Sequence, residues 1–188
     1  MTFYFDHNAT SPATAEHLQK VVTLLSASQG NPSSPHTMGR NASVAVTQAR
    51  KKVALAIGFD VAEIVFLSGG SEANNLGTVG VMRSAGVPLS FQHAIASPVE
   101  HPSIREPLEM AVSSEGLKVT TLNVTSSGSV FVDELIKSIL PSTTLVTIMA
   151  ANNETGSIQP VQEFAKWLHA KRWEKPARTD VTPHPFDF

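Results

Sequence analysis

The sequence predicts an α/β fold, with a mainly parallel sheet and helices on both of its faces. Short apolar runs alternate with amphipathic segments of helical period along most of the chain, which is typical of parallel sheets with helical crossovers. The run TLVTIMA at residues 144–150 is continuous rather than alternating, as in a strand buried on both faces. Polar clusters rich in Gly, Ser, His and Asn follow three of the runs, where open α/β sheets bind ligands.

The composition is that of one ordinary domain or of part of a larger one. The 188 residues are 41% hydrophobic and carry a formal net charge of -2, so they can form a packed core. The 14 basic residues are scattered, so no nucleic-acid partner is expected. No apolar run approaches the roughly 20 residues that cross a bilayer, and the N-terminus lacks a secretory signal. We therefore expect a cytoplasmic protein with no membrane partner.

Two helices are expected in the first third of the chain. One covers residues 14–27, and the other follows the loop 29–40 and ends at Gly58, because glycine is the usual residue at the end of a helix. The residues expected to face inward are Leu18, Val21, Val22 and Leu25 on the first helix and Val46, Ala49, Val53 and Ile57 on the second. The run EIVFL, residues 63–67, is expected to form a short strand.

Helices and strands are expected to alternate over the rest of the chain. A helix is predicted over 71–84, although Gly77 and Gly80 each weaken it by about 1 kcal/mol relative to Ala. The predicted strands are 92–98, 117–124 and 144–150, and the predicted helices begin at Pro102 and cover 132–140 and about 160–171. The residues expected to be buried on the first and last of these helices are Ile104, Leu108, Ala111, Val161, Phe164 and Leu168.

The tail 172–188 breaks the alternation. Charged residues and three prolines stand where another buried strand is due, and proline is excluded from central strands. The expected organisation is therefore an N-terminal segment, 1–13, a partial α/β domain, 14–171, and a divergent, disordered tail, 172–188.

The stretch FLSGGSEANNLG, residues 66–77, joins an apolar run directly to a helical pattern. Gly69 and Gly70 allow a ligand to approach the backbone, and the Ser71 hydroxyl adds a donor at a helix start that favours anions. The spacing matches neither the dinucleotide fingerprint nor the P-loop, and no lysine follows. Two interpretations stay open here, a tight turn with no further role or a cradle for a phosphate group.

Two further polar clusters follow predicted strands. His101 comes after the strand 92–98, where a histidine is placed to stack on a planar ligand or to move a proton. Asn152, Asn153 and Glu154 come after the strand 144–150. A lone histidine is usually structural, and Asn and Gly suit turns. Three such clusters at one edge of a sheet nevertheless favour a ligand site.

Five motifs resemble, in order and approximate spacing, those of the cysteine desulfurases and selenocysteine lyases. These are class V, fold-type I enzymes that depend on pyridoxal 5'-phosphate. The motifs are YFDHNATSP, GNPSSPHTMGR, IVFLSGGSEANN, SPVEHPSI and VTIMAANNETG. The resemblance runs from about Tyr4 to Leu168 and implies part of the large domain of the fold-type I pyridoxal-phosphate-dependent transferases. For the family it implies a homodimer that removes sulfur or selenium from cysteine or selenocysteine and leaves alanine.

The resemblance also implies roles for individual residues. Gly70, through its backbone, and Ser71 would hold the cofactor phosphate. His101 would stack over the pyridine ring and help to move protons. Asn153 would form a hydrogen bond near the 3-oxygen of the ring and the substrate. No metal ligands are implied.

Other parts of the family pattern concern the two ends of the chain. The resemblance places Asn8 and Ala9 beside the substrate. The family pattern continues with an Asp that pairs with the pyridine nitrogen, a lysine that holds the cofactor covalently and a sulfur-accepting cysteine, and none of these is recognisable. Asp180 falls near the place of the family's Asp, but no apolar strand precedes it. The chain contains no cysteine at all. We therefore expect the N-terminal half of such an enzyme, inactive alone.

Three alternative functions stay open. The chain could be a non-catalytic fragment or isoform that associates with a full-length subunit. It could be a class V aminotransferase-like enzyme with another amino-acid substrate. A generic phosphate-binding α/β module is the third alternative.

Overall fold

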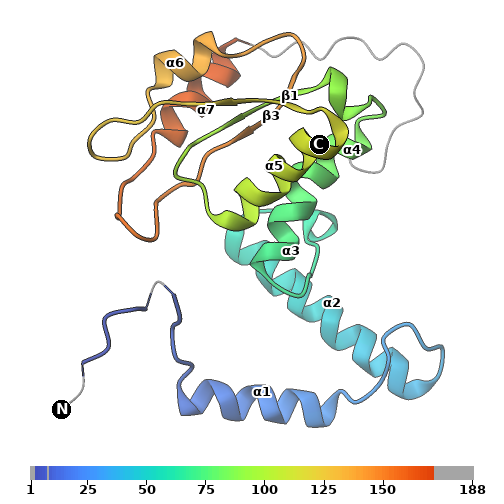
Figure 1. Ribbon diagram of the computed structural model, residues 1–188. Helices are drawn as coiled ribbons and strands as arrows, with labels where there is room; N and C mark the ends of the chain where they lie inside the picture. Colours follow the sequence, from blue (N-terminus) through green and yellow to red (C-terminus); the bar gives the residue numbers. More distant parts are fainter. Residues whose placement is uncertain (1–2, 8, 172–188) are drawn as a thin grey trace. The chain divides into compact units, whose positions relative to one another are not determined.

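The computed structural model describes residues 3–7 and 9–171, so the predicted tail lies outside the described residues. The chain divides into two compact units, Met1–Ser68 and Gly69–Phe188, and both can be followed by colour in Figure 1. The boundary falls inside the segment 14–171 that the sequence suggests as one domain.

The first unit is helical in its described part. It contains the helices α1, Ala15–Ala27, and α2, Thr37–Ile57, and the 3-10 turn η1, Val61–Glu63. The side chain of Thr14 accepts the His17 N–H and so caps the start of α1, as short hydroxyl side chains commonly do. The α2 helix ends at Gly58, which has the left-handed φ of 76° that favours glycine. The predicted end of this helix is therefore confirmed.

The apolar residues expected to face inward in this unit are exposed. On α1, Leu18 is 55% and Leu25 68% exposed, and on α2, Ile57 is 57% exposed. The buried residues of α2 are instead Gly39, Ala42 and Ala54. The periodicity identified the helices correctly, but no described element of this unit covers their apolar faces.

The predicted strand at 63–67 is wrong. Residues 64–67 have no strand assignment, because a strand requires backbone hydrogen bonds to a neighbour and no described segment supplies them. The segment is attached to α2 through Arg50. The Arg50 Nε donates to the Ile64 carbonyl oxygen over 3.1 Å, and its guanidinium lies 5.2 Å from the centre of the Phe66 ring.

The second unit contains a parallel sheet and its helices. Its helical segments are α3, Gly70–Asn75, the π-helical turn η2, Leu76–Gly80, α4, Val81–Ser84, the 3-10 turn η3, Leu89–Phe91, α5, Pro102–Glu115, α6, Val132–Lys137, and α7, Val161–Ala170; its strands are β1, His93–Ala96, β2, Lys118–Thr121, and β3, Thr143–Thr147. The helix predicted over 71–84 is therefore present, but its two glycines lie in a π-helical turn, where helices are locally wider.

The three strands are parallel and have the order β2-β1-β3. In the central strand, Ile95 pairs with Thr120 on one side and Val146 on the other. This arrangement confirms the α/β class and the parallel sheet. It also places the carboxyl ends of all three strands at one edge.

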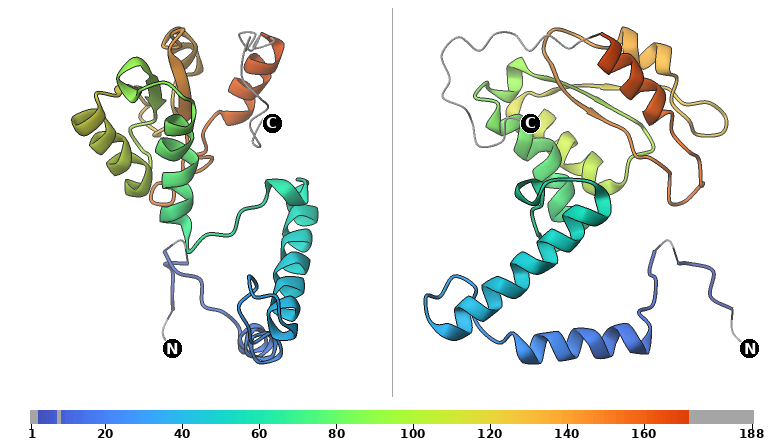
Figure 2. Two further views of the ribbon diagram at one scale, coloured as in Figure 1. Left: turned by 90° about the vertical axis from the view of Figure 1, so that its right-hand side faces the viewer. Right: turned by 180° about the vertical axis from the view of Figure 1, so that it is seen from behind.

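Helices cover both faces of this sheet, as the views in Figures 1 and 2 show. Ala94 and Ala96 of β1 pack with residues of α4 and α5, including Met82 and Leu108. Ile95 points to the opposite face, where its core cluster includes Leu135 of α6 and is contacted by Phe164 of α7. Side chains alternate along a strand, and the two cores follow from that alternation.

The expectation of complete burial is wrong for β3 and for α7. Within β3, Thr143 is buried, whereas Leu145, Val146 and Thr147 are half-buried. Val161, Phe164 and Leu168 of α7, which were expected to be buried, are also half-buried. The cause is that β3 pairs with one strand only among the described residues.

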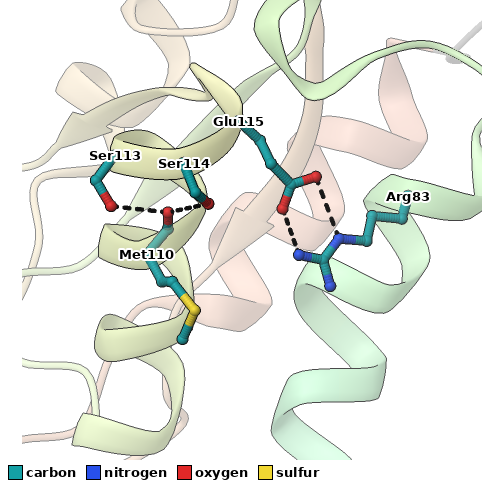
Figure 3. Close-up of polar contacts among 5 residues, drawn as sticks. All are labelled: Arg83, Met110, Ser113, Ser114 and Glu115. Carbon is teal, nitrogen blue, oxygen red and sulfur yellow. Dashed lines mark hydrogen bonds and ion pairs between the residues drawn. The ribbon is translucent and has the colours of Figure 1, made fainter.

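The segment α3–α4 is attached to α5 at both of its ends. Near the starts, Asn74 of α3 donates a hydrogen bond to the Ser103 hydroxyl over 2.7 Å. Near the ends, Arg83 of α4 and Glu115 of α5 form a two-point ion pair (Figure 3). The hydrogen bonds from Arg83 hold the pKa of Glu115 below its ordinary value. The two helical segments therefore run side by side in the same direction.

Candidate functional site

The start of α3 contains two glycines that the chain's own conformation does not require. Gly69 has an extended φ of 173°, and Gly70 is not among the glycines with positive φ. A Cβ atom built on Gly69 or on Gly70 meets no protein atom within 4 Å. Neither position has the left-handed conformation for which a turn would require glycine. Open space beside these backbones fits the phosphate cradle.

The donors of this site come from the first turn of α3. The first N–H groups of a helix have no carbonyl partner inside it. Gly69, at the cap position, has no side chain that could accept a hydrogen bond from them. Ser71 adds a hydroxyl in the same turn. Together with the helix dipole, these groups form a local environment that favours an anion.

His101 lies at the start of α5, directly after the loop that follows β1. It occupies the cap position, where its Nδ1 accepts the Ser103 N–H over 3.1 Å. The same ring nitrogen is 2.7 Å from the Ser103 hydroxyl oxygen. The imidazole is exposed, so one of its nitrogens holds it to the helix while the ring is accessible to a ligand.

The starts of α3 and α5 are brought together by Asn74 and Ser103. Asn74 is four residues, about 6 Å along the helix axis, beyond Gly70, and Ser103 is two residues beyond His101. The 2.7 Å hydrogen bond between their side chains therefore places the predicted phosphate cradle and the predicted stacking residue in one region of the second unit.

Asn153 lies in the turn after β3 and is exposed. Its neighbour Asn152 is buried and shapes that turn. The Asn152 Oδ1 accepts the N–H groups of Glu154 and Thr155 over 2.9 and 2.8 Å, and its Nδ2 donates to the Val99 carbonyl oxygen over 3.0 Å. Asn152 therefore connects the turn that carries Asn153 to the loop that leads into His101.

Glu100 makes a second connection between these two loops. It is 8% exposed, and its carboxylate accepts the Met149 N–H over 2.6 Å. Burial raises its pKa, and the hydrogen bonds from Met149 and from the Thr147 side chain only partly offset that effect. Glu100 and Ser103 were not predicted as site residues, and Asn152 was named only as a member of a polar cluster, without this connecting role. The Asn-x-Glu-Thr spacing of an Asx-type turn is a signal that points to Asn152.

The predicted substrate residues belong to the first unit. Asn8 lies outside the described residues, and Ala9 is exposed in a turn in which its N–H donates to the Asp6 carbonyl oxygen over 3.2 Å. The Tyr4 hydroxyl closes the same segment by bonding the carbonyl oxygens of Asp6 and Thr10. Their role beside a substrate stays a prediction, and Asp180 also lies outside the described residues.

A hollow of about 450 Å³ lies beside the strand ends but does not coincide with this site. Its apolar lining comes from α5 and β2, including Ile104, Leu108 and Val119. None of Gly70, Ser71, His101 and Asn153 lines it, so we do not assign the cofactor to this hollow.

No lysine of the described part of the second unit follows the carboxyl end of a strand. Lys118 begins β2, Lys137 ends α6, Lys166 lies inside α7 and Lys171 follows it. Helices that connect parallel strands run back toward the amino ends of those strands, so the last turn of α6, between β2 and β3, points away from the candidate site. None of the described helices is both long and apolar enough for a membrane span.

Comparison with known families gives a match over most of the chain. The aminotransferase class-V family matches residues 3–173. A human selenocysteine lyase is 39% identical over 190 residues, which covers 93% of this chain and 43% of that protein. A cysteine desulfurase IscS from Dictyoglomus turgidum is 40% identical over 163 residues, with 87% of this chain and 41% of the relative covered. The chain thus spans less than half the length of these curated relatives.

Solved structures give the same result. A NifS-like protein superposes with a TM-score of 0.80 at 36% identity, covering 92% of this chain and 46% of the other. A structure described as SspA in complex with cysteine has a TM-score of 0.79 at 32% identity, covering 90% of this chain and 48% of the other. The structural similarity therefore extends over both units and again concerns about half of each relative.

Proposed function

Because the chain belongs to the aminotransferase class-V family, we propose that it supplies the pyridoxal-phosphate-binding half of a cysteine desulfurase or selenocysteine lyase. The observation that carries this proposal is the open helix start at Gly70 and Ser71, joined to His101 through one hydrogen bond between Asn74 and Ser103. These groups combine anion donors with an accessible aromatic ring, which a phosphorylated pyridine requires.

The residues present fit the cofactor's chemistry. The Gly70 N–H, the Ser71 N–H and the Ser71 hydroxyl would bind the phosphate. The exposed His101 imidazole would stack on the pyridine ring, and the Asn153 amide would donate to its 3-oxygen. When bound, pyridoxal phosphate supplies an electron sink that stabilises negative charge on an amino-acid substrate.

The substrate would be cysteine or selenocysteine, and the product alanine. The basis is the identity of about 40% to a selenocysteine lyase and a cysteine desulfurase, and cysteine is present in the structure of the related SspA. Asn8 and Ala9 would contact this amino acid, and a homodimer would be the functional assembly. The reaction belongs to the longer enzymes, since this chain covers under half of their length.

A competition experiment tests the proposed site. We expect pyridoxal 5'-phosphate to bind the purified chain, inorganic phosphate to displace it, and pyridoxal without the phosphate to bind at least tenfold more weakly, because charge-assisted hydrogen bonds are worth about 1.5–3 kcal/mol. Ser71→Ala should weaken the binding of pyridoxal 5'-phosphate and leave the affinity for pyridoxal unchanged. Equal affinity for pyridoxal and its phosphate would contradict the proposal.

A second candidate function is a non-catalytic subunit that associates with a longer relative. The observation that favours it is the exposure of apolar residues on α1 and α2, including Leu25 and Leu55, which is 85% exposed. Exposed apolar patches of this kind mark association surfaces. Co-expression of the chain with a tagged full-length relative should then give a stoichiometric complex, and its absence would remove this candidate.

A further inference from the structure

The hydrogen bonds of His101 define which of its ring nitrogens carries the proton. The Ser103 backbone N–H lies 3.1 Å from Nδ1 and can only donate. Nδ1 must therefore be the acceptor, and an acceptor nitrogen carries no proton. In the neutral imidazole the proton is then on Nε2.

A second donor reaches the same nitrogen through Ser103 and Asn74. The Asn74 Nδ2 donates to the Ser103 hydroxyl oxygen over 2.7 Å. That oxygen is in turn 2.7 Å from the His101 Nδ1. Because the amide nitrogen can only donate, the proton of the Ser103 hydroxyl is left to point at Nδ1. The three side chains form a row of donors that all run from α3 toward the imidazole.

We propose that Asn74 and Ser103 are positioning residues that hold His101 in its Nε2–H tautomer. This inference rests on the proposed function for its consequence, which is that the ring meets the cofactor as a stacking surface and as a hydrogen-bond donor. In this form Nδ1 accepts from the Ser103 N–H and hydroxyl, so Nε2–H is the ring group left to donate to the cofactor.

The start of α5 opposes the alternative tautomer. A proton on Nδ1 would face the Ser103 N–H, donor against donor, and would remove the cap of the helix. The hydrogen bonds at the start of α5 therefore favour the Nε2–H tautomer of the neutral imidazole.

Nuclear magnetic resonance of the full chain, labelled with ¹⁵N-histidine and free of cofactor, tests this inference. The His101 signals are identified by their loss in His101→Gln, and solid-state spectra serve equally if the chain assembles. We expect a directly bonded proton on Nε2 and none on Nδ1. Ser103→Ala should shift the Nδ1 resonance toward that of an unbonded nitrogen, and Ser103→Thr should restore it.

Two further variants separate positioning from folding. Asn74→Asp has nearly the same shape but only accepts, so it should draw the Ser103 proton away and shift Nδ1 as Ser103→Ala does. Ser113→Ala is the matched control, because this α5 serine donates to the Met110 carbonyl oxygen over 2.9 Å and has no contact with His101. It should leave the His101 signals unchanged.

A proton on Nδ1 in the unsubstituted chain would overturn the inference, whichever variants fold. An unchanged Nδ1 resonance in folded Ser103→Ala and Asn74→Asp would overturn it as well. Pyridoxal 5'-phosphate is then added to the same samples. Failure to bind would count against the proposed function alone, since the tautomer is measured before the ligand is present.

Discussion

The side-chain amide of Asn152 donates a hydrogen bond to the Val99 carbonyl oxygen, 3.0 Å away, and so connects the loops that follow β3 and β1. The other end of the same amide accepts two backbone N–H groups of the turn 153–155. One buried side chain therefore determines both the shape of the turn that carries Asn153 and its attachment beside the segment that leads to His101.

Asn152→Ala should lower the free energy of unfolding by about 2 kcal/mol, because it removes three hydrogen bonds of a buried side chain. Urea titration followed by circular dichroism measures the change. Asn153→Ala is the matched control, since the side chain is exposed and the loss should be smaller. Equal losses in the two variants would show that Asn152 does not organise the turn.

The stability of the chain should decrease as the pH falls below about 6.5, and His93 is the cause. It is 2% exposed at the start of β1, and its two ring nitrogens lie 2.8 Å from the hydroxyls of Thr143 and Thr120. Burial lowers its pKa, and the charge of Lys118 adds to the effect.

The unfolded chain takes up a proton on His93 near pH 6.5, whereas the folded chain does so only at lower pH. Between these two pKa values, each pH unit costs up to about 1.4 kcal/mol of stability. His93→Gln should reduce this slope in urea titrations between pH 7 and 5. An identical pH dependence in the variant would contradict the assignment.

The exposed apolar faces predict that the chain self-associates or needs a partner when expressed alone. Leu18 and Leu25 of α1 are 55% and 68% exposed and lie on one face of the helix. Replacing both with lysine should shift the chain toward smaller species in sedimentation velocity. Gln19→Lys with Ser26→Lys adds the same charge one position along and should have less effect. A monodisperse unsubstituted monomer with a cooperative melt would be contrary to this prediction.

The order of elements in the second unit could be predicted because its signals are local. Three buried residues of α5, Ile104, Leu108 and Ala111, follow helical period and are all buried as expected. Glycine at the end of α2 is a similarly local signal. Family motifs then suggested the candidate site, since Gly70 and His101 each follow a recognisable junction.

The errors concern features that depend on distant neighbours. Val65 and Phe66 have the composition of a strand but no strand to pair with among the described residues, and they are 57% and 46% exposed. β3 is half-buried because it pairs with only one strand among the described residues. Its composition does not reveal this, since a sheet edge cannot be recognised from one strand's composition. Ser103 and the connecting role of Asn152 were missed because their partners lie on other segments of the chain.

The 188 residues alone should show no desulfurase or lyase turnover. Covalent chemistry with the cofactor needs a lysine amine beside its aldehyde carbon, and the described lysines of the second unit do not lie after strand ends. A sulfur-accepting thiolate is also absent, because the chain has no cysteine. Covalent attachment is measured by borohydride reduction of the chain with pyridoxal phosphate, followed by peptide mass mapping. Turnover is measured in parallel by an alanine-release assay.

Scattered partial labelling without alanine is the expected result of that experiment. Stoichiometric modification of one specific lysine, accompanied by steady alanine production, would defeat the prediction. Noncovalent binding of the cofactor would not, because the phosphate contacts at Gly70 and Ser71 do not require a lysine.

The affinity of Gly70→Val for pyridoxal 5'-phosphate, compared with that of Gly77→Val, tests the central claim most directly. Both glycines lie in the same helical stretch, and a Cβ on either meets no protein atom within 4 Å, so the two variants should keep similar helix content. The added methyl groups occupy the proposed phosphate position only at Gly70. We predict that Gly70→Val weakens binding by about 10- to 100-fold and that Gly77→Val binds as the unsubstituted chain does. Equal affinity in the two variants would contradict the phosphate cradle at the start of α3.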